Sequence, residues 1–149
     1  MSNVSRTIDW ETIRVGDELP GLAVALTPTV VVAAAIASRD FMPVHHDRDY
    51  ASAQGAPNIF TNILTDTGFC SRFLTDWAGP NAMVKRLAIR LGIPAFAGST
   101  LTYTGTVTGK TRGNGEGLVE VGFSAATDTM GEHLSGTAVV SLPIAGGRT

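Results

Sequence analysis

The chain has 149 residues, of which 44% are hydrophobic and 16% are charged. This length and balance indicate a globular domain that buries about 70% of the surface of its unfolded chain, and they exclude a disordered protein. The net charge of −2 at pH 7 gives a nucleic-acid role no electrostatic support. We expect a single domain over residues 1–149, with residues 1–9 and 146–149 as loose tails.

Two helices are predicted in the first half of the chain. Thr27 is suited to cap a helix that starts at Pro28, and residues 29–38 form an alanine- and valine-rich run without a polar face, which indicates a buried helix. Residues 39–49 are expected to form a loop. A second helix is predicted from about Ile59 to about Trp77, because apolar residues recur there at broadly helical spacing.

The second half alternates between apolar and polar residues, as strands with one buried face do. This alternation predicts strands over residues 100–108, 119–124 and 134–142, and a less regular strand over residues 83–91. The turns at residues 113–115 (GNG) and 128–131 (DTMG) suit hairpins. The sequence therefore predicts an α+β domain in which a long buried helix packs on an antiparallel meander.

Cys70 is the single cysteine, so it cannot form an internal disulfide and fits a reducing compartment. We expect it to be inert core. The longest apolar stretch, residues 30–37, is far shorter than the roughly 20 residues of a membrane span. The N-terminus shows no secretory signal pattern. We therefore expect a cytoplasmic protein that binds no membrane.

The loop over residues 38–47 reads SRDFMPVHHD and carries the strongest indication of chemistry. It places the carboxylate of Asp40 five residues before the imidazole of His45 in a proline-containing turn. Such a pair suits the addition of water, because one group must take a proton from water and a group must return one to carbon. Asp40 and His45 are the candidate catalytic pair, and a structural hydrogen-bonded pair is the alternative.

This loop resembles that of the MaoC-type (R)-enoyl-CoA hydratase family, whose pattern is Ser-Gly-Asp-x-Asn-Pro-(Ile/Val)-His-x-Asp followed by Tyr-Ala. The chain matches its aspartate and histidine with Asp40 and His45, and Tyr50-Ala51 follows. The resemblance runs from about Val15 to Pro143. It implies a hot-dog fold, in which an antiparallel sheet wraps around a long central helix. It also implies hydration of a (2E)-enoyl-CoA to a 3-hydroxyacyl-CoA, with the coenzyme A thioester as substrate and no cofactor.

Within this family, four segments resemble the small MaoC-type subunit of bacterial steroid (cholesterol) side-chain enoyl-CoA hydratases. They are Arg39-Asp40-Phe41, residues 44–49, IFTNILTDTG at 59–68 and TDWAGP at 75–80. This resemblance implies a steroid acyl group and a larger MaoC-domain partner that helps to form a wide acyl pocket. We expect either a homodimer or a 2:2 heterotetramer, since a lone hot-dog sheet leaves an edge that a second domain can extend.

Three residues depart from the family pattern. Met42 replaces the loop asparagine, and Thr61 and Asn62 stand where the family has His-Gly at the start of the central helix. The free N–H groups of a helix start can bind an oxyanion, so Thr61 and Asn62 are predicted to lie at the thioester carbonyl. The Asn62 side chain is expected to narrow or re-aim the pocket, which moves the substrate away from short fatty chains.

Lys85, Arg86 and Arg90 are candidates for contacts with the phosphates of coenzyme A, and a solvated strand face is the alternative. Two other functions stay open. One is dehydration of a 3-hydroxyacyl chain on acyl carrier protein, and the other is a non-catalytic partner subunit whose pocket has decayed.

The remaining titratable residues give weaker indications. Adjacent histidines rarely converge on one ion, so we expect no metal at His45, His46 and Asp47. His46 is expected to face solvent or to neighbour the site, and His133 to be exposed beside a hairpin turn. Asp66 can face the site, the packed interior or solvent.

Overall fold

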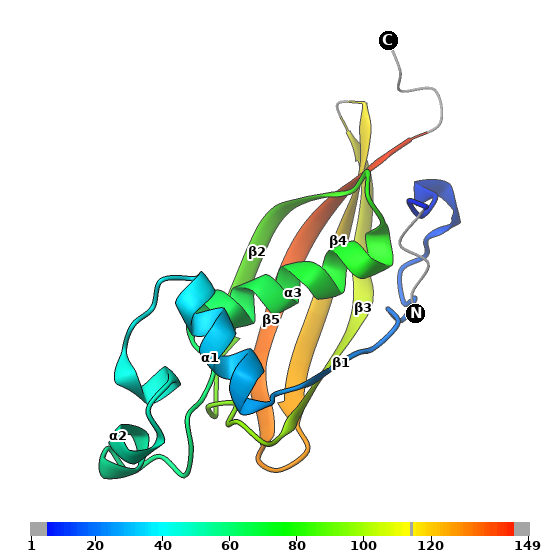
Figure 1. Cartoon of the computed structure of the whole chain (residues 1–149). Helices are drawn as coiled ribbons and strands as arrows, with labels where there is room; N and C mark the ends of the chain where they lie inside the picture. Colours follow the sequence, from blue (N-terminus) through cyan, green and yellow to red (C-terminus); the bar gives the residue numbers. More distant parts are fainter. Residues whose placement is uncertain (1–5, 114, 145–149) are drawn as a thin grey trace.

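The computed structural model describes residues 6–113 and 115–144, in which a five-stranded antiparallel sheet curves around one long helix (Figure 1). This confirms the α+β hot-dog arrangement predicted from the sequence. The strands lie in the order β1-β3-β4-β5-β2. Their bounds are β1 Leu22–Ala25, β2 Met83–Leu91, β3 Thr100–Gly113, β4 Glu116–Thr127 and β5 Gly131–Pro143.

The long helix is α3 (Ile63–Ala78), which lies across the concave face of the sheet. Phe73 and Leu74 of α3 are fully buried, and the Phe73 ring stacks on Tyr103 of β3 with ring centroids 5.7 Å apart. Buried and exposed residues alternate along β3 and β4, as the sequence predicts. The core therefore lies between α3 and the inner face of the sheet.

The predicted start of α3 at Ile59 is wrong, because residues 59–61 are extended. The Ala97 N–H donates to the Ile59 carbonyl at 2.9 Å, and the Thr61 N–H donates to the Ala95 carbonyl at 3.1 Å. These bonds pair residues 59–61 with residues 95–97, which precede β3. The helix starts only at Ile63, where the Asn62 side chain caps it by accepting the Thr65 N–H at 3.0 Å.

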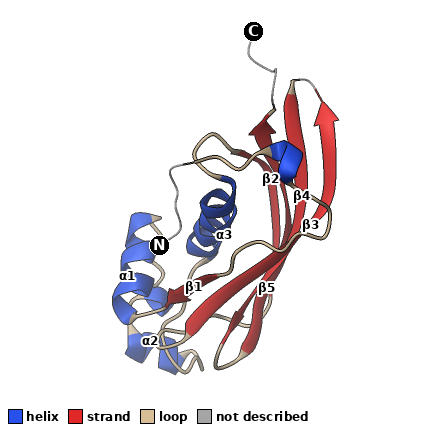
Figure 2. Cartoon of the chain, turned by 90° about the vertical axis from the view of Figure 1, so that its right-hand side faces the viewer, coloured by secondary structure: helices blue, strands red, loops and turns tan. Residues whose placement is uncertain are grey.

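The first helix, α1 (Pro28–Ala37), begins where the sequence predicts it. The Thr27 hydroxyl accepts the Val30 N–H at 3.2 Å, and Pro28 is the first helical residue. Only Val31 and Ala35 are buried in α1, and Ile36 is 46% exposed. The prediction of a well-buried helix is therefore wrong for the single chain, in which α1 lies beside the first half of α3 (Figures 1 and 2).

Several short elements are present that the sequence patterns do not predict. Strand β1 pairs with β3, and the short helix α2 (Arg48–Ala53) begins within the last two residues of the predicted loop, with the Asp47 side chain as its cap. Two 3-10 turns, η1 (Trp10–Thr12) and η2 (Pro43–His45), complete the set. Strand β2 pairs with β5, so the sheet is not a simple meander.

The N-terminal residues 6–9 pack against the far end of α3, which differs from the loose tail predicted for residues 1–9. The Ile8 N–H donates to the Ala78 carbonyl at 3.0 Å, and the Thr7 hydroxyl accepts the Asn81 N–H at 2.9 Å. Residues 1–5, and the predicted tail at 146–149, lie outside the described residues. Within residues 6–113 and 115–144, no helix has both the length and the hydrophobicity needed to cross a membrane.

Candidate active site

The loop that carries Asp40 leaves the C-terminal end of α1 through a left-handed residue. Arg39 has φ 58°, a left-handed conformation that disfavours residues other than glycine. The family pattern has glycine at this position. The Arg39 N–H donates to the Ile36 carbonyl at 3.0 Å, and the Asp40 N–H donates to the Ala35 carbonyl at 2.9 Å. These bonds close the helix and turn Asp40 toward the start of α3.

His45 ends η2 and is 7% exposed. Its Nδ1 lies 2.8 Å from the Phe60 carbonyl oxygen, and its ring packs edge-on against the Phe60 ring at 5.1 Å. A carbonyl can only accept, so Nδ1 carries the proton in this bond. In neutral His45, the lone pair is therefore on Nε2, which faces Asp40.

Asp40 lies beside that lone pair, with its Oδ2 atom 3.4 Å from His45 Nε2. Oδ2 accepts the Asn62 Nδ2–H at 2.9 Å, and Oδ1 accepts the Met42 N–H at 3.2 Å. The Asn62 bond, followed by the Met42 bond, lowers the pKa of Asp40 below its ordinary value, and a positive charge on His45 lowers it further. The site thus holds a carboxylate at neutral pH.

The geometry of this pair suits a bound water. Carboxylate Oδ2 and the Nε2 atom of neutral His45 are both acceptors, so they make no hydrogen bond to each other, whereas a water can donate one hydrogen to each. The Asp40 side chain keeps 30% of its surface exposed, so solvent reaches it. The structure therefore brings the two residues of the predicted pair together at the N-terminal end of α3.

Thr61 and Asn62 lie at that same helix end and are 5% and 3% exposed. Within the described part of the chain, the backbone N–H groups of Ile63 and Leu64 meet no protein acceptor, and the buried Thr61 Oγ1 has no partner either. Such free donors suit a developing oxyanion. The Asn62 side chain, predicted to narrow or re-aim the pocket, donates hydrogen bonds to Asp40 and Ser38.

The three basic residues on β2 are not gathered at the pair. Lys85 forms an ion pair with Glu116, with Nζ and Oε2 3.1 Å apart. Arg86 and Arg90 are exposed on the same strand, as His46 is on its turn. Contacts of Lys85, Arg86 and Arg90 with coenzyme A stay a prediction.

A second histidine–aspartate pair, which no sequence motif predicts, lies inside the core. His133, predicted to be exposed, is 3% exposed, and its Nε2 lies 3.2 Å from Oδ1 of the buried Asp66. Cys70 is buried nearby, as predicted, and burial raises the pKa of its thiol to about 12. No sequence pattern links Asp66 with His133, which is 67 residues further on; only the fold brings them together.

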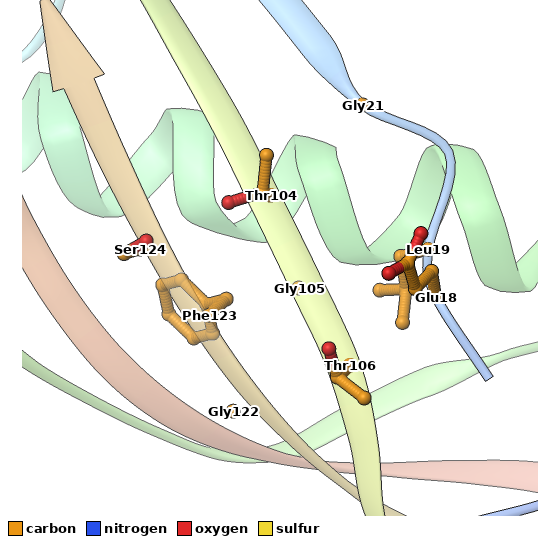
Figure 3. Close-up of a pocket in the computed structure, with 9 residues that line it drawn as sticks. All are labelled: Glu18, Leu19, Gly21, Thr104, Gly105, Thr106, Gly122, Phe123 and Ser124. Carbon is orange, nitrogen blue, oxygen red and sulfur yellow. The ribbon is translucent and has the colours of Figure 1, made fainter. Parts of the chain in front are cut away.

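A groove of about 590 Å³ lies elsewhere, between residues 18–21 and strands β3 and β4 (Figure 3). Its polar side chains include Glu18, Thr104, Thr106 and Ser124. Figure 3 shows α3 behind these strands, so the groove opens on the side of the sheet away from the helix. It lacks both Asp40 and His45, and it is separate from the site at the start of α3.

A central helix wrapped by an antiparallel sheet, with an Asp–His pair beside the start of that helix, defines a hot-dog domain with a candidate acid–base site. The chain belongs to the MaoC-like domain family, whose model matches residues 14–129.

Two matches support this assignment, one to a curated sequence and one to a solved structure. The chain is 46% identical over 128 residues to the 3-oxo-4,17-pregnadiene-20-carboxyl-CoA hydratase beta subunit of Mycobacterium tuberculosis, a match that covers 86% of this chain and 95% of that protein. The crystal structure of the ChsH1-ChsH2 complex from M. tuberculosis contains a chain of 46% identity. It superposes with a TM-score of 0.79 over 88% of this chain and 98% of that one.

A more distant structure shows the fold alone. The (R)-hydratase from A. caviae involved in PHA biosynthesis is 22% identical and superposes with a TM-score of 0.80, over 89% of this chain and 99% of the hydratase.

Proposed function

We propose that this chain is the MaoC-like subunit of a hydratase that adds water across the double bond of a steroid side-chain enoyl-CoA. The relative of 46% identity is named as a hydratase of such a thioester, and its beta subunit matches this chain over nearly its whole length. The chain is accordingly an enzyme of the hydro-lyase class. The reaction needs no cofactor beyond the coenzyme A of its substrate, and we expect it to take place in the cytoplasm.

The observation that carries the proposal is the 3.4 Å approach of His45 Nε2 to Asp40 Oδ2. A water held between these two acceptors attacks the β-carbon while the pair removes its proton. The pair then returns a proton to the α-carbon on the same face. Each transferred proton thus comes from water or from the pair, and no other reagent is consumed.

The start of α3 supplies the second half of the mechanism. The thioester carbonyl binds against the free backbone N–H groups of Ile63 and Leu64, which stabilise the enolate that forms as water attacks. Donors of this kind lower a barrier by roughly 3–4 kcal/mol each. The carbonyl site and the water site lie at the same helix end. The conjugated double bond and carbonyl of the enoyl-thioester can therefore occupy both, whatever the size of the acyl group.

A second subunit completes the proposed enzyme, as the similarity to the ChsH1-ChsH2 complex supports. Four large apolar side chains around the site are solvent-exposed in the single chain: Phe41 at 60%, Met42 at 50%, Ile63 at 52% and Leu64 at 54%. An apolar surface of this kind is typical of a binding interface. We propose that the partner and the acyl group cover it, in a 2:2 assembly whose mass native mass spectrometry of the co-expressed subunits can measure.

Hydration removes the ultraviolet absorbance of the conjugated enoyl-thioester, so the rate at which this absorbance falls tests the catalytic pair in Asp40→Asn and His45→Ala. Each variant should lose at least about 100-fold in kcat, since general acid–base groups contribute roughly 10²–10⁴-fold. His46→Ala is the matched control, because His46 is the adjacent, exposed imidazole. Wild-type turnover in either pair variant would disprove the proposal, and the same acyl group offered on acyl carrier protein tests the choice of carrier.

A further inference from the structure

We propose that Asn62 is a positioning residue, whose side-chain amide holds the Asp40 carboxylate beside His45 Nε2. The inference rests on the proposed function and adds a residue that acts through Asp40 rather than on the substrate. Asn62 lies 22 residues after Asp40 in the chain, outside the loop motif that identifies the catalytic pair.

The orientation of the Asn62 amide follows from its partners. Its Oδ1 accepts both the backbone N–H and the hydroxyl of Thr65. Its Nδ2 must therefore point the other way, where it donates to Asp40 Oδ2 at 2.9 Å and to Ser38 Oγ at 2.9 Å. A flipped amide would place its carbonyl oxygen against the carboxylate and leave the Thr65 donors without an acceptor.

Ser38 makes this arrangement specific. Its hydroxyl donates to the Ala34 carbonyl at 2.8 Å, which leaves a lone pair free to accept from Asn62. Asn62 is 3% exposed, so water competes little for these bonds. The amide thus ties the end of α1, the catalytic loop and the start of α3 to one another.

Two of the departures from the family pattern, Met42 and Asn62, fit this role together. The loop asparagine is Met42 here, so the catalytic loop carries no side-chain amide, while the glycine expected at the helix start is Asn62. The side-chain amide that binds Asp40 therefore comes from the start of α3 and not from the loop that carries Asp40. Since Asn62 also caps α3, one residue couples the position of the carboxylate to the helix end that faces the substrate carbonyl.

The electrostatics point the same way. The bond from Asn62 is the largest cause of the lowered pKa of Asp40, ahead of the Met42 N–H and the charge on His45. His45 is the titratable side chain that faces Asp40 in the structure. Removal of the amide donor should therefore raise the pKa of Asp40 and move its carboxylate away from Nε2.

The experiment compares Asn62→Ser and Asn62→Asp in the complete hydratase. Serine is a good helix cap, so Asn62→Ser keeps an acceptor for the Thr65 N–H but loses the donor to Asp40. Aspartate keeps both shape and cap but sets a second carboxylate against Asp40. The matched control is Asn58→Ser, because the Asn58 amide donates to the Ala97 carbonyl and accepts the Ile59 N–H, away from Asp40.

We expect Asn62→Ser to lose roughly 100-fold in kcat with little change in KM, as displaced catalytic groups do. The acidic limb of the kcat/KM profile should move to higher pH, because Asp40 then protonates at a higher pH. Asn62→Asp should show both effects more strongly, and Asn58→Ser should keep the wild-type profile. Carboxyl ¹³C NMR titration of Asp40 reports the same shift without an assay.

Wild-type kcat and an unmoved acidic limb in Asn62→Ser would overturn the inference, as would a variant that only unfolds at lower temperature. If Asn62→Ser does not fold, the shape-preserving Asn62→Asp decides by the same two readouts. Activity of Asp40→Asn would instead refute the proposed function, so the two failures are distinguishable.

Discussion

His133 and Asp66 face each other inside the core, with Nε2 and Oδ1 3.2 Å apart and with residue exposures of 3% and 1%. Asp66 belongs to the first turn of α3, and His133 lies near the start of β5. The His133 Nδ1 atom lies 2.6 Å from the Ile93 carbonyl oxygen, in the segment that joins β2 to β3. The pair therefore ties three segments together below the start of the central helix.

Removal of one member of this pair should destabilise the fold. We expect Asp66→Ala to lower the free energy of unfolding by about 3 kcal/mol, because it leaves a buried imidazole without its partner. Urea denaturation measures the loss. The control is Asp76→Ala on the same helix, whose ion pair with Arg72 is on the surface and should contribute less than about 1 kcal/mol. Equal losses in the two variants would contradict the assignment.

The same pair should make stability depend on pH. Burial acts to lower the pKa of His133, but the Asp66 hydrogen bond, the Ile93 carbonyl and the Asp66 charge together raise it above 6.5. A histidine whose pKa is higher in the folded state than in the unfolded state stabilises the fold fully when the pH is below its unfolded-state pKa. That stabilisation is lost as the pH rises through the folded-state pKa. The difference in unfolding free energy between wild type and His133→Gln should therefore shrink as pH rises above 6.5. A difference that stays constant would show that His133 does not bind a proton on folding.

The thiol of Cys70 should be inert in the folded protein. The residue is fully buried, and burial, followed by the charge of Asp66, raises the pKa of its thiol to about 12. We expect no reaction with a disulfide reagent at about pH 8 in buffer, and one thiol per chain in urea. Rapid labelling of the native protein would contradict the burial of Cys70.

The left-handed conformation of Arg39 predicts opposite effects for two substitutions. Arg39→Gly should raise the free energy of unfolding by up to about 1 kcal/mol, because glycine adopts φ 58° without steric cost. Arg39→Val should lower it by about 1–2 kcal/mol, since a branched side chain crowds that conformation. Thermal unfolding of the two variants measures whether each substitution raises or lowers stability. A loss of stability in the glycine variant would show that the conformation of Arg39 is not strained.

Gly79, which follows α3, should tolerate no side chain. Its φ is 90°, and an added Cβ would lie 2.5 Å from the Arg6 carbonyl oxygen. Gly55 has a similar φ of 87° but no neighbouring atom within 4 Å, so it is a matched control. We expect Gly79→Ala to lose about 2 kcal/mol more than Gly55→Ala, because only the former forces the N-terminal segment away. Similar chemical denaturation midpoints for both variants would argue against this contact.

Sequence patterns correctly predicted those helices and strands whose position depends on residues within or next to the element itself. Thr27 and Pro28 place the start of α1, and the alternation along β3 and β4 follows directly from burial of one face. The start of α3 was misplaced because its apolar spacing continues through residues that pair with residues 95–97 instead. Strand β1 has four residues, too few for a recognisable alternation.

The candidate site divides in the same way. Asp40 and His45 share one loop, so their motif could be recognised in the sequence, and the structure places them 3.4 Å apart. The hydrogen bond from Asn62 to Asp40 and the burial of His133 depend on segments that meet only in the folded chain. Periodicity and turn patterns describe neighbours along the chain, and they contain no information about such distant partners.

The central helix is anchored at both ends: at its start the Asn62 side chain binds Asp40, and at its end the Ala78 carbonyl accepts the Ile8 N–H. A helix of 16 residues is a stiff rod of about 24 Å, so displacement of one end tilts the other. A bulky fusion joined close to residue 6 would therefore act as a lever on the site, although it lies a full helix length away.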